Sequence, residues 1–279
     1  MTALAVDHLV VRFGGLDVID DLSFSVRAGE RLVIFGPNGA GKTTLFNVIT
    51  GQLHPTAGRV SLFGQDITAV SVAKRGGLGA RGPLQNAPPL SPLATGGPRH
   101  HGHGRRVDLG LDRTFQIATL FPRLTVLESA MLAVQAGAPH RFVMHRAVHS
   151  YAGTRRRALE LLEAWDLAPR ADIETRRLAY GEQRRIELVL ALARRPRLLL
   201  LDEPAAGLSA EETAAVVAMI REMPRDVTIM LIEHDVDMAL QLADRVLVLQ
   251  HGRLLADGDP TSIRHDPQVA EVYFGAGRG

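Results

Sequence analysis

Short apolar runs recur near both ends of the chain, each bounded by glycine, proline or charged residues. Runs of this length that are rich in Val, Ile, Leu and Phe are typical of buried β-strands. Helical patterns at residues 210–223 and 236–243 alternate with the later runs, which indicates a parallel sheet covered by helices. The pattern therefore predicts an α/β fold. The expected strands are residues 9–13, 22–26, 32–35, 59–63, 198–201, 227–232 and 245–249.

A helical texture replaces these runs over residues 124–195. In the stretch RRRALELLEAWDLAP, Ala158, Leu161, Leu162 and Trp165 follow one another at the spacing of a single helix face. Trp165 is the only tryptophan, and its place on this apolar face favours a packing role over a ligand-binding role. We therefore expect a helical subdomain in this part of the chain.

Residues 74–106 have a biased composition. Gly, Pro, Arg and His accumulate there, and the segment from 67 to 107 contains no acidic residue. Such a composition offers little apolar surface to bury, so we expect a flexible, low-complexity insertion. Its histidines His100, His101 and His103 lack the carboxylate or cysteine partners of a typical metal site, and we expect them to be solvated.

Length and composition are those of a globular protein, with 279 residues of which 46% are hydrophobic and 22% charged. The absence of cysteine excludes disulfides, thiolate metal sites and cysteine nucleophiles. The N-terminus has no basic start or small-residue cleavage site, and no apolar run approaches the length of a membrane span. We therefore expect a chain that is soluble by itself. A formal net charge of +2 gives no argument for binding nucleic acid.

The stretch LVIFGPNGAGKTTLFNVIT places a glycine-rich loop between an apolar strand and a helical run. This order matches the phosphate-binding loop, in which glycines let backbone N–H groups point at phosphate oxygens and the following helix adds its positive dipole. Lys42 would reach the β- and γ-phosphates of ATP, and the Thr43 hydroxyl would bind Mg²⁺. A glycine-rich turn with a chance lysine would not explain both flanks. The predicted nucleotide-binding residues are Gly36, Pro37, Asn38, Gly39, Ala40, Gly41, Lys42, Thr43 and Thr44.

The stretch RLLLLDEP predicts how water is activated. Its leucines make a buried strand, Asp202 at the carboxyl end is placed to hold Mg²⁺, and Glu203 is placed as the general base. The alternative is that both carboxylates cap the following helix. His234 ends the later strand TIMLIEHD, where its imidazole would contact the γ-phosphate and orient the attacking water. A structural role for this histidine is the competing interpretation.

The stretch LAYGEQRRIELVLALARRPRLLLLDEP resembles the signature helix and the Mg²⁺-binding strand of the ABC-type ATPases, and the resemblance extends over nearly the entire chain. It implies one ABC ATPase domain over 1–279, with a P-loop nucleotide-binding core at 1–123 and 196–279, an N-terminal antiparallel β part and the signature in the helical subdomain at 124–195. It also implies that the signature contacts the γ-phosphate bound to an opposite subunit, so two ATPase chains would face each other head to tail. The implied signature residues are Ala179, Tyr180, Gly181, Glu182 and Gln183.

Further roles follow from the same resemblance. RTFQ resembles the loop whose glutamine, here Gln116, senses Mg²⁺ and the attacking water while contacting the membrane partner. VRFGG places Phe13 where the family stacks an aromatic ring on adenine, with a buried core position as the alternative. The helical subdomain would dock two transmembrane permeases, which receive substrate from a solute-binding protein. The chain would then lie at the cytoplasmic face of the cell membrane as a peripheral subunit, with no nucleic acid partner.

Three stretches resemble the ATP-binding subunits of branched-chain amino-acid importers, namely LDRTFQIATLFPRLTVLESAMLAV, LLLLDEPAAGLSAEET and the tail GRLLADGDPTSIRHDPQVAEVYFG. The insertion at 74–106 is not part of that pattern. Two positions depart from the wider family, because Ala179 stands where a serine is usual and Ser209 stands where an aspartate is common. Since backbone N–H groups must then replace one hydroxyl donor, we expect an active enzyme with a modest rate.

Other functions fit parts of the pattern. Urea and amide importers share much of it, and the transported substrate is selected by the partner chains. Soluble ABC proteins that act on ribosomes or DNA generally carry two ATPase domains, whereas one phosphate loop and one signature occur here. A P-loop kinase would not explain the signature. We therefore predict an ATPase that powers the uptake of branched-chain amino acids and pairs with a second, identical or related, ATPase subunit.

Overall fold

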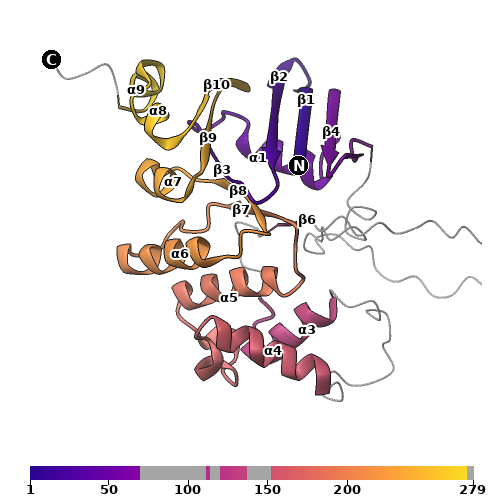
Figure 1. Ribbon diagram of the computed structural model, residues 1–279, viewed down its shortest axis with the longest axis vertical. Coiled ribbons are helices and arrows are strands. Elements are labelled where there is room, and N and C mark those ends of the chain that lie inside the picture. The colour runs from indigo at the N-terminus through magenta and orange to yellow at the C-terminus, as the bar shows by residue number, and fades with distance from the viewer. Residues whose placement is uncertain (70–110, 114–119, 137–151, 275–279) are drawn as a thin grey trace, which may run out of the picture.

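The computed structural model describes residues 1–69, 111–113, 120–136 and 152–274, and their strands form two sheets (Figure 1). The first sheet is antiparallel, with the strand order β2-β1-β4-β5. Along β1, Leu4, Val6, Leu9 and Val11 are all buried. A register shift between Val6 and Leu9 keeps Leu9 and Val11 on the same face of the sheet as Leu4 and Val6. The strands are β1 (Thr2–Phe13), β2 (Leu16–Arg27), β4 (Ala57–Leu62) and β5 (Gln65–Asp66).

The second sheet has the strand order β10-β9-β3-β8-β7-β6, and its pairings are parallel except in the β9–β10 hairpin. Every residue of β3, β7 and β8 is buried, as is typical of parallel strands covered on both faces. Leu198 and Leu200 pack into one hydrophobic core, whereas Leu199 and Leu201 pack into another. The strands are β3 (Arg31–Phe35), β6 (Leu111–Arg113), β7 (Leu198–Asp202), β8 (Thr228–Ile232), β9 (Arg245–Gln250) and β10 (Arg253–Gly258).

Helices cover the parallel sheet on both faces. The core that α1 shares with the antiparallel sheet lies on one face, and the core built from α3, α4, α5 and α6 lies on the other. In Figure 1 the antiparallel sheet lies at one end of the molecule, while α3, α4 and α5 lie beyond the parallel sheet at the other end. The helices are α1 (Lys42–Thr50), α3 (Val126–Ala136), α4 (Ala152–Ala164), α5 (Tyr180–Leu192), α6 (Ala210–Glu222), α7 (Val236–Leu242), α8 (Pro260–Arg264) and α9 (Pro267–Phe274), with 3₁₀ turns at η2 (Ala168–Arg170) and η3 (Thr175–Arg177).

The predicted α/β fold and its N-terminal antiparallel part are confirmed. Each expected strand coincides with or overlaps an observed strand, and the two expected helices are α6 and α7. The elements β5, β6, β10, α8 and α9 were not predicted. Trp165 directly follows α4 and packs, partly buried, against the second core, as its place in the pattern predicted. The insertion at 74–106 and its histidines lie outside the described residues, as does Gln116.

Candidate active site

The glycine-rich loop joins the carboxyl end of β3 to the first turn of α1. Gly39 and Gly41 have φ values of 81° and 96°, a region that glycine enters at little cost. Gly36 has no room for a side chain, because a Cβ atom there would lie 2.3 Å from the carbonyl oxygen of Leu249. The loop thus depends on bare backbone to reach its shape, which is the arrangement that exposes N–H groups to an anion.

The loop also lies at a junction of three chain segments. A Cβ atom on Gly41 would lie 2.8 Å from the carbonyl oxygen of Val18 in β2, and one on Gly252 would lie 2.5 Å from the same oxygen. Gly252 belongs to the β9–β10 turn, and its N–H donates to the carbonyl of Ala40 at 3.3 Å. Its own carbonyl accepts from the N–H of Asp20 at 3.0 Å. Backbone contacts therefore join the loop to both sheets.

The Lys42 side chain folds back onto the glycine-rich loop that precedes it. Its side chain is buried, with the residue 6% exposed, and Nζ donates to the carbonyls of Gly36 at 2.5 Å and Pro37 at 3.0 Å. Burial lowers the pKa of Lys42, while the nearby charges of Glu203 and Asp202 act in the opposite direction. The structure thus places one cation close to both predicted acidic residues, at the edge of the sheet where β3 ends.

Asp202, Glu203 and His234 meet at this same edge, because β3, β8 and β7 are neighbouring parallel strands. Asp202 is the last residue of β7 and is 2% exposed. The Glu203 carboxylate lies 2.5 Å from Nε2 of His234. The structure thus brings together the proposed base and the proposed water-orienting imidazole. The alternative that Asp202 and Glu203 cap the next helix is wrong, because α6 starts at Ala210 and is capped by Ser209.

Glu203 has an unusual backbone. Its φ of 48° lies in the left-handed region, which is rare for residues other than glycine. The backbone N–H donates to the carbonyl of Ile232 at the end of β8, at 3.0 Å. Strained positions of this kind cluster at functional sites, where the surroundings hold them in place.

Glu233 is a buried carboxylic acid that the sequence analysis did not single out. It is 4% exposed and accepts long hydrogen bonds from the N–H groups of Ala205 at 3.5 Å and His234 at 3.3 Å. Burial raises the pKa of Glu233 to about 7, and the charges of Glu203 and Asp235 add to the effect. Its position one residue before the predicted His234 was the signal available in the sequence.

The signature segment forms the start of α5, with Ala179 as the extended residue before the helix. Its polar side chains are used locally. Glu182 accepts from the N–H of Ala179 at 3.2 Å and pairs with Arg170 at 2.6 Å, and Gln183 donates to the carbonyl of Leu178 at 3.0 Å. These contacts fix the first turn of the helix, whose N–H groups are the anion-binding feature.

The backbone of Gly181 in this turn lies against a carboxylate from α6. A Cβ atom on Gly181 would lie 2.3 Å from Oε1 of Glu212, so a larger residue there would have to displace this carboxylate. The Glu212 carboxylate also accepts from the N–H of Ser209 at 2.9 Å, and the backbone N–H of Glu212 donates to the Ser209 hydroxyl at 3.3 Å, at the start of α6. The hydroxyl of Tyr180 lies 3.4 Å from the carbonyl of Ala206. The signature and the segment after Glu203 are thus in direct contact.

Two further predicted residues have different outcomes. Phe13 lies at the end of β1 and is 52% exposed, so the alternative that it is a core residue is wrong. Its exposed ring remains available for stacking. Gln116 lies outside the described residues, so its proposed role stays a prediction.

The described residues fit a magnesium ion. Mg²⁺ prefers oxygen ligands and is bound by one or two protein side chains together with substrate phosphates. Thr43 offers a hydroxyl from an exposed position in the first turn of α1, and Asp202 offers a carboxylate at the end of β7. Both positions belong to the edge of the sheet that carries the phosphate loop. When bound, the ion would neutralise phosphate charge there.

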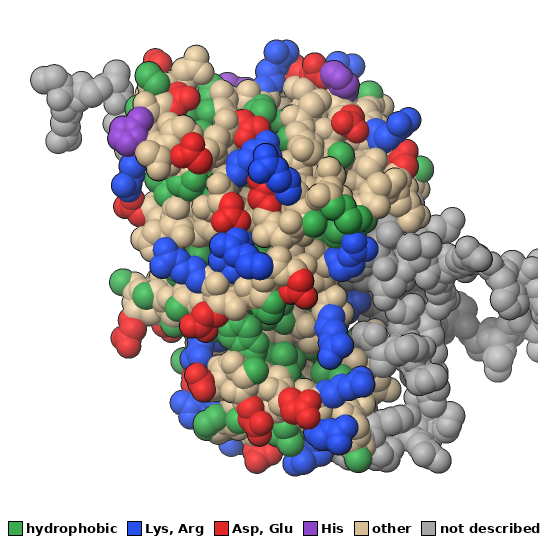
Figure 2. Space-filling view, viewed as in Figure 1, with side chains coloured by type: hydrophobic (Ala, Val, Ile, Leu, Met, Phe, Trp, Pro, Cys, Tyr) green, Lys and Arg blue, Asp and Glu red, His purple; other side chains and the backbone are tan. Residues whose placement is uncertain are grey.

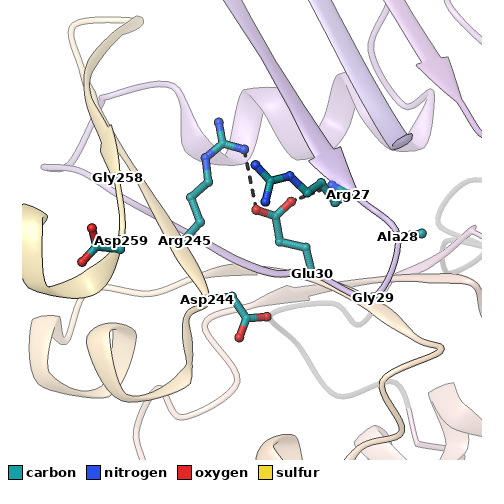
Figure 3. A pocket seen from close by; sticks show the side chains of 8 residues that line it. All are labelled: Arg27, Ala28, Gly29, Glu30, Asp244, Arg245, Gly258 and Asp259. Atoms are coloured by element: carbon teal, nitrogen blue, oxygen red, sulfur yellow. Dashed lines mark hydrogen bonds and ion pairs between the residues drawn. The ribbon is translucent and has the colours of Figure 1, made fainter. Parts of the chain in front are cut away.

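A separate hollow lies at the opposite end of the parallel sheet, around the beginnings of β3 and β9 (Figure 3). Two of its charged groups, Glu30 and Arg245, pair with each other. Glu30 accepts from the N–H of Arg27 at 2.6 Å and lies 3.6 Å from Arg245, whose guanidinium also pairs with Asp257 at 2.5 Å. Because the phosphate loop is at the other end of β3, this hollow is not the nucleotide site.

Comparison with known proteins agrees with this geometry. Residues 19–206 match the family model of the ABC transporter, and residues 253–278 match that of the branched-chain amino acid ATP-binding cassette transporter. The chain resembles the solved structure of a nucleotide-free ATP-binding cassette from an ABC transporter, with a TM-score of 0.76, 26% identity and coverage of 99% of this chain and 100% of the other. An ATP-binding cassette of an ABC transporter in its ADP conformation gives a TM-score of 0.77 at 26% identity, with coverage of 99% and 100%.

Curated relatives align along almost their whole length. The high-affinity branched-chain amino acid transport ATP-binding protein BraF of Pseudomonas aeruginosa is 34% identical, over 98% of this chain and 97% of its own. LivG of Escherichia coli, which carries the same description, is 33% identical with the same coverage. The lipopolysaccharide export system ATP-binding protein LptB of Haemophilus influenzae is 28% identical, over 99% and 98%.

The fold, the phosphate loop and the matched models define the class: the chain belongs to the ATP-binding proteins of ABC transporters. It is therefore an ATPase that serves a transporter complex. Within that class, its C-terminal segment and its relatives place it in the branched-chain amino acid type. Both levels of the resemblance seen in the sequence are confirmed. Among the residues that the structure describes, none of the helices combines the length and the apolarity needed to cross a membrane.

Proposed function

We propose that the chain hydrolyses MgATP to power the uptake of branched-chain amino acids through partner permeases. The observation that carries this proposal is the match of residues 253–278 to the branched-chain model. This segment covers β10, α8 and α9, and Ile263 and Val269 bury their side chains in a core shared with β9. The segment that matches the branched-chain model is thus packed into the fold.

We assign the chemistry to the residues at the edge of the parallel sheet. Glu203 acts as the general base and His234 orients the attacking water beside it, which their 2.5 Å contact supports. Thr43 and Asp202 bind Mg²⁺ together with Gln116, and Lys42 contacts the β- and γ-phosphates once it exchanges its loop carbonyls for phosphate oxygens. Phe13 stacks on adenine. The bare backbone of Gly36, Gly39 and Gly41 supports the phosphate cradle.

The site requires a second ATPase subunit, identical or related. The signature of one chain, at the start of α5, contacts the γ-phosphate bound by the other, so ATP closes the pair. Because Ala179 has no hydroxyl, the N–H groups of the first turn supply the donors, and the incoming phosphate shares this turn with the Glu212 carboxylate that lies against Gly181. The proposed signature residues Tyr180, Glu182 and Gln183 support the turn.

The other proposed partners are two transmembrane permeases and, indirectly, a solute-binding protein. The helices α3, α4 and α5, at the end of the molecule remote from the antiparallel sheet, would dock the permeases at the cytoplasmic face of the membrane (Figure 1). On the face seen in Figure 2, basic and acidic side chains are interspersed. That mixture supports the expectation of no nucleic acid partner, because such a partner favours a one-sign basic surface.

Urea or amide import is the alternative. The experiment that separates them reconstitutes the chain with the permeases and binding protein encoded beside it in liposomes and measures the ATPase rate against leucine and urea. Leucine should stimulate hydrolysis. Stimulation by urea alone would refute the amino-acid assignment while leaving the importer, and full activity without any membrane partner would refute both.

A further inference from the structure

The helix that carries the signature also holds the backbone of the catalytic loop. Arg184 lies one turn into α5, and its side chain is 3% exposed. Its Nη2 donates to the carbonyl of Glu203 at 2.8 Å, and its Nε donates to the carbonyl of Pro204 at 2.9 Å. Two adjacent peptide groups of the loop that follows β7 are therefore held by one planar guanidinium.

The guanidinium is itself fixed in place. Its Nη1 pairs with Glu187, one turn further along α5, at 2.9 Å, and the Glu187 side chain is 10% exposed. Because arginine presents its donors in a rigid planar fork, contacts to Glu187 on one side and two carbonyls on the other leave it little freedom. Burial raises the pKa of Glu187, whereas the Arg184 charge opposes that rise.

Arg184 holds the carbonyl of Glu203, the residue with the left-handed backbone. Glu203 has its φ of 48°, and its N–H is held by Ile232 at 3.0 Å. Its carbonyl accepts from Arg184 and also from the N–H of Ala206 at 3.1 Å. The left-handed residue is thus held on both sides, and with this backbone its carboxylate lies 2.5 Å from His234.

We propose that Arg184 is a positioning residue that couples the signature at the start of α5 to the carboxylate of Glu203 in the same chain. This role rests on the proposed function, in which Glu203 is the base. It would make the base at one ATP site of the pair respond to the phosphate bound at the other site. A phosphate bound at the signature engages the first turn of α5, and Arg184 extends from the next residues of the same rigid helix. The placement of Glu203 then depends on what the signature binds.

The test compares Arg184→Gln with a matched control, Arg31→Gln. Arg31 is also buried, at 6% exposure, and it also donates to two backbone carbonyls, those of Arg221 at 2.8 Å and Met223 at 2.9 Å. It lies at the beginning of β3, away from the carboxyl ends of the strands. Both variants lose a buried guanidinium, so a loss of melting temperature is common to both. Only a positioning role predicts a selective loss of turnover.

In the reconstituted transporter, Arg184→Gln should lower kcat on the order of 10- to 100-fold, while the KM for ATP and the Kd for MgATP stay within about threefold. Arg184→Lys, which keeps the charge beside Glu187 but has no planar fork, should give an intermediate kcat even if the Gln variant folds poorly. Glu187→Gln leaves both carbonyl contacts available and should change kcat by less than about threefold. Arg31→Gln should leave kcat unchanged.

Equal kcat values for wild type, Arg184→Gln and Arg184→Lys in an active transporter would overturn the positioning role of Arg184 but not the proposed function. So would a parallel fall of kcat in Arg31→Gln, because that result would trace the loss to stability. An inactive wild-type assembly would instead overturn the proposed function, and the inference with it. In a Glu203→Gln background, Arg184→Gln should retain the ATP-dependent pairing of two ATPase chains, measured by light scattering, because the signature itself is intact. Loss of this pairing would contradict a role of Arg184 in positioning the base.

Discussion

Glu233 makes the stability of this protein depend on pH, because its carboxyl group is buried. Burial raises its pKa to about 7 from an ordinary value of 4.5, so the folded chain holds a proton that the unfolded chain has lost between these two values. Because the folded state binds more protons there, its stability falls as the pH rises from about 4.5 to about 7 and then levels off. The stabilising effect of the neutral acid is complete below that window and absent above it.

The size of the effect follows from the same values. A difference of 2.5 units between 7 and 4.5, at about 1.4 kcal/mol per unit, corresponds to roughly 3 kcal/mol of unfolding free energy. Glu233→Gln removes the ionisable proton but keeps an acceptor for the N–H groups of Ala205 and His234. The variant should therefore be close to wild type near pH 5 and about 3 kcal/mol more stable than wild type near pH 8.

Urea unfolding followed by circular dichroism at several pH values between 5 and 8.5 measures this difference. Glu222→Gln is the matched control, because Glu222 is an exposed carboxylate at the end of α6. Its stability should run parallel to that of wild type at every pH. If the Glu233→Gln curve also ran parallel to the wild-type curve, the buried carboxyl would not hold its proton in the folded state, and the reasoning would be wrong.

Two further changes test the active site, and a third tests the cap of α6. Glu203→Gln should bind MgATP with unchanged affinity but lose about 10²- to 10⁴-fold in kcat, since only the base is removed; a normal turnover number would exclude Glu203 as the base. Lys42→Ala should weaken MgATP binding by about 10- to 100-fold in a nucleotide titration, because it deletes a charge-assisted phosphate contact, and an unchanged Kd would contradict that contact. Ser209→Ala should lower the unfolding free energy by about 1 kcal/mol through loss of the α6 cap, whereas Ser209→Asp, which restores an acceptor, should not; equal loss in both would refute the capping role.

The sequence predicted the parts of this site that depend on local pattern. The phosphate loop, Asp202 and His234 each follow a short apolar run, and parallel strands bring such ends to one edge. The unpredicted β10 also had a local signal. His251 and Gly252 have φ values of 48° and 76°, the geometry of a two-residue hairpin turn, and a His-Gly pair is a weaker form of the usual Asn-Gly signal.

Other features had no local signal. Arg184 is one of several arginines in the signature stretch, and only packing of α5 against the end of β7 shows which one reaches the Glu203 carbonyl. Ser209 stands where the family often has an aspartate, which suggested a lower rate, yet the structure gives it a capping role at α6. The proximity of Glu212 to Gly181 likewise depends on how two helices meet. Such contacts join residues through the tertiary fold, which spacing along the chain does not encode.

The junction around Val18 has a consequence for how this protein can diverge. The phosphate loop at Gly41, the antiparallel sheet at Val18 and the β9–β10 turn at Gly252 touch through main-chain atoms, with the Ile19 side chain beside them. A side chain added at Gly41 or Gly252 would collide with the carbonyl of Val18, so neither glycine can be replaced without moving the junction. The segment specific to the branched-chain type begins at residue 253, immediately after Gly252. The matched C-terminal segment is therefore one residue away from a backbone contact with the phosphate loop, and a displacement of the β9–β10 turn would pass directly to that loop.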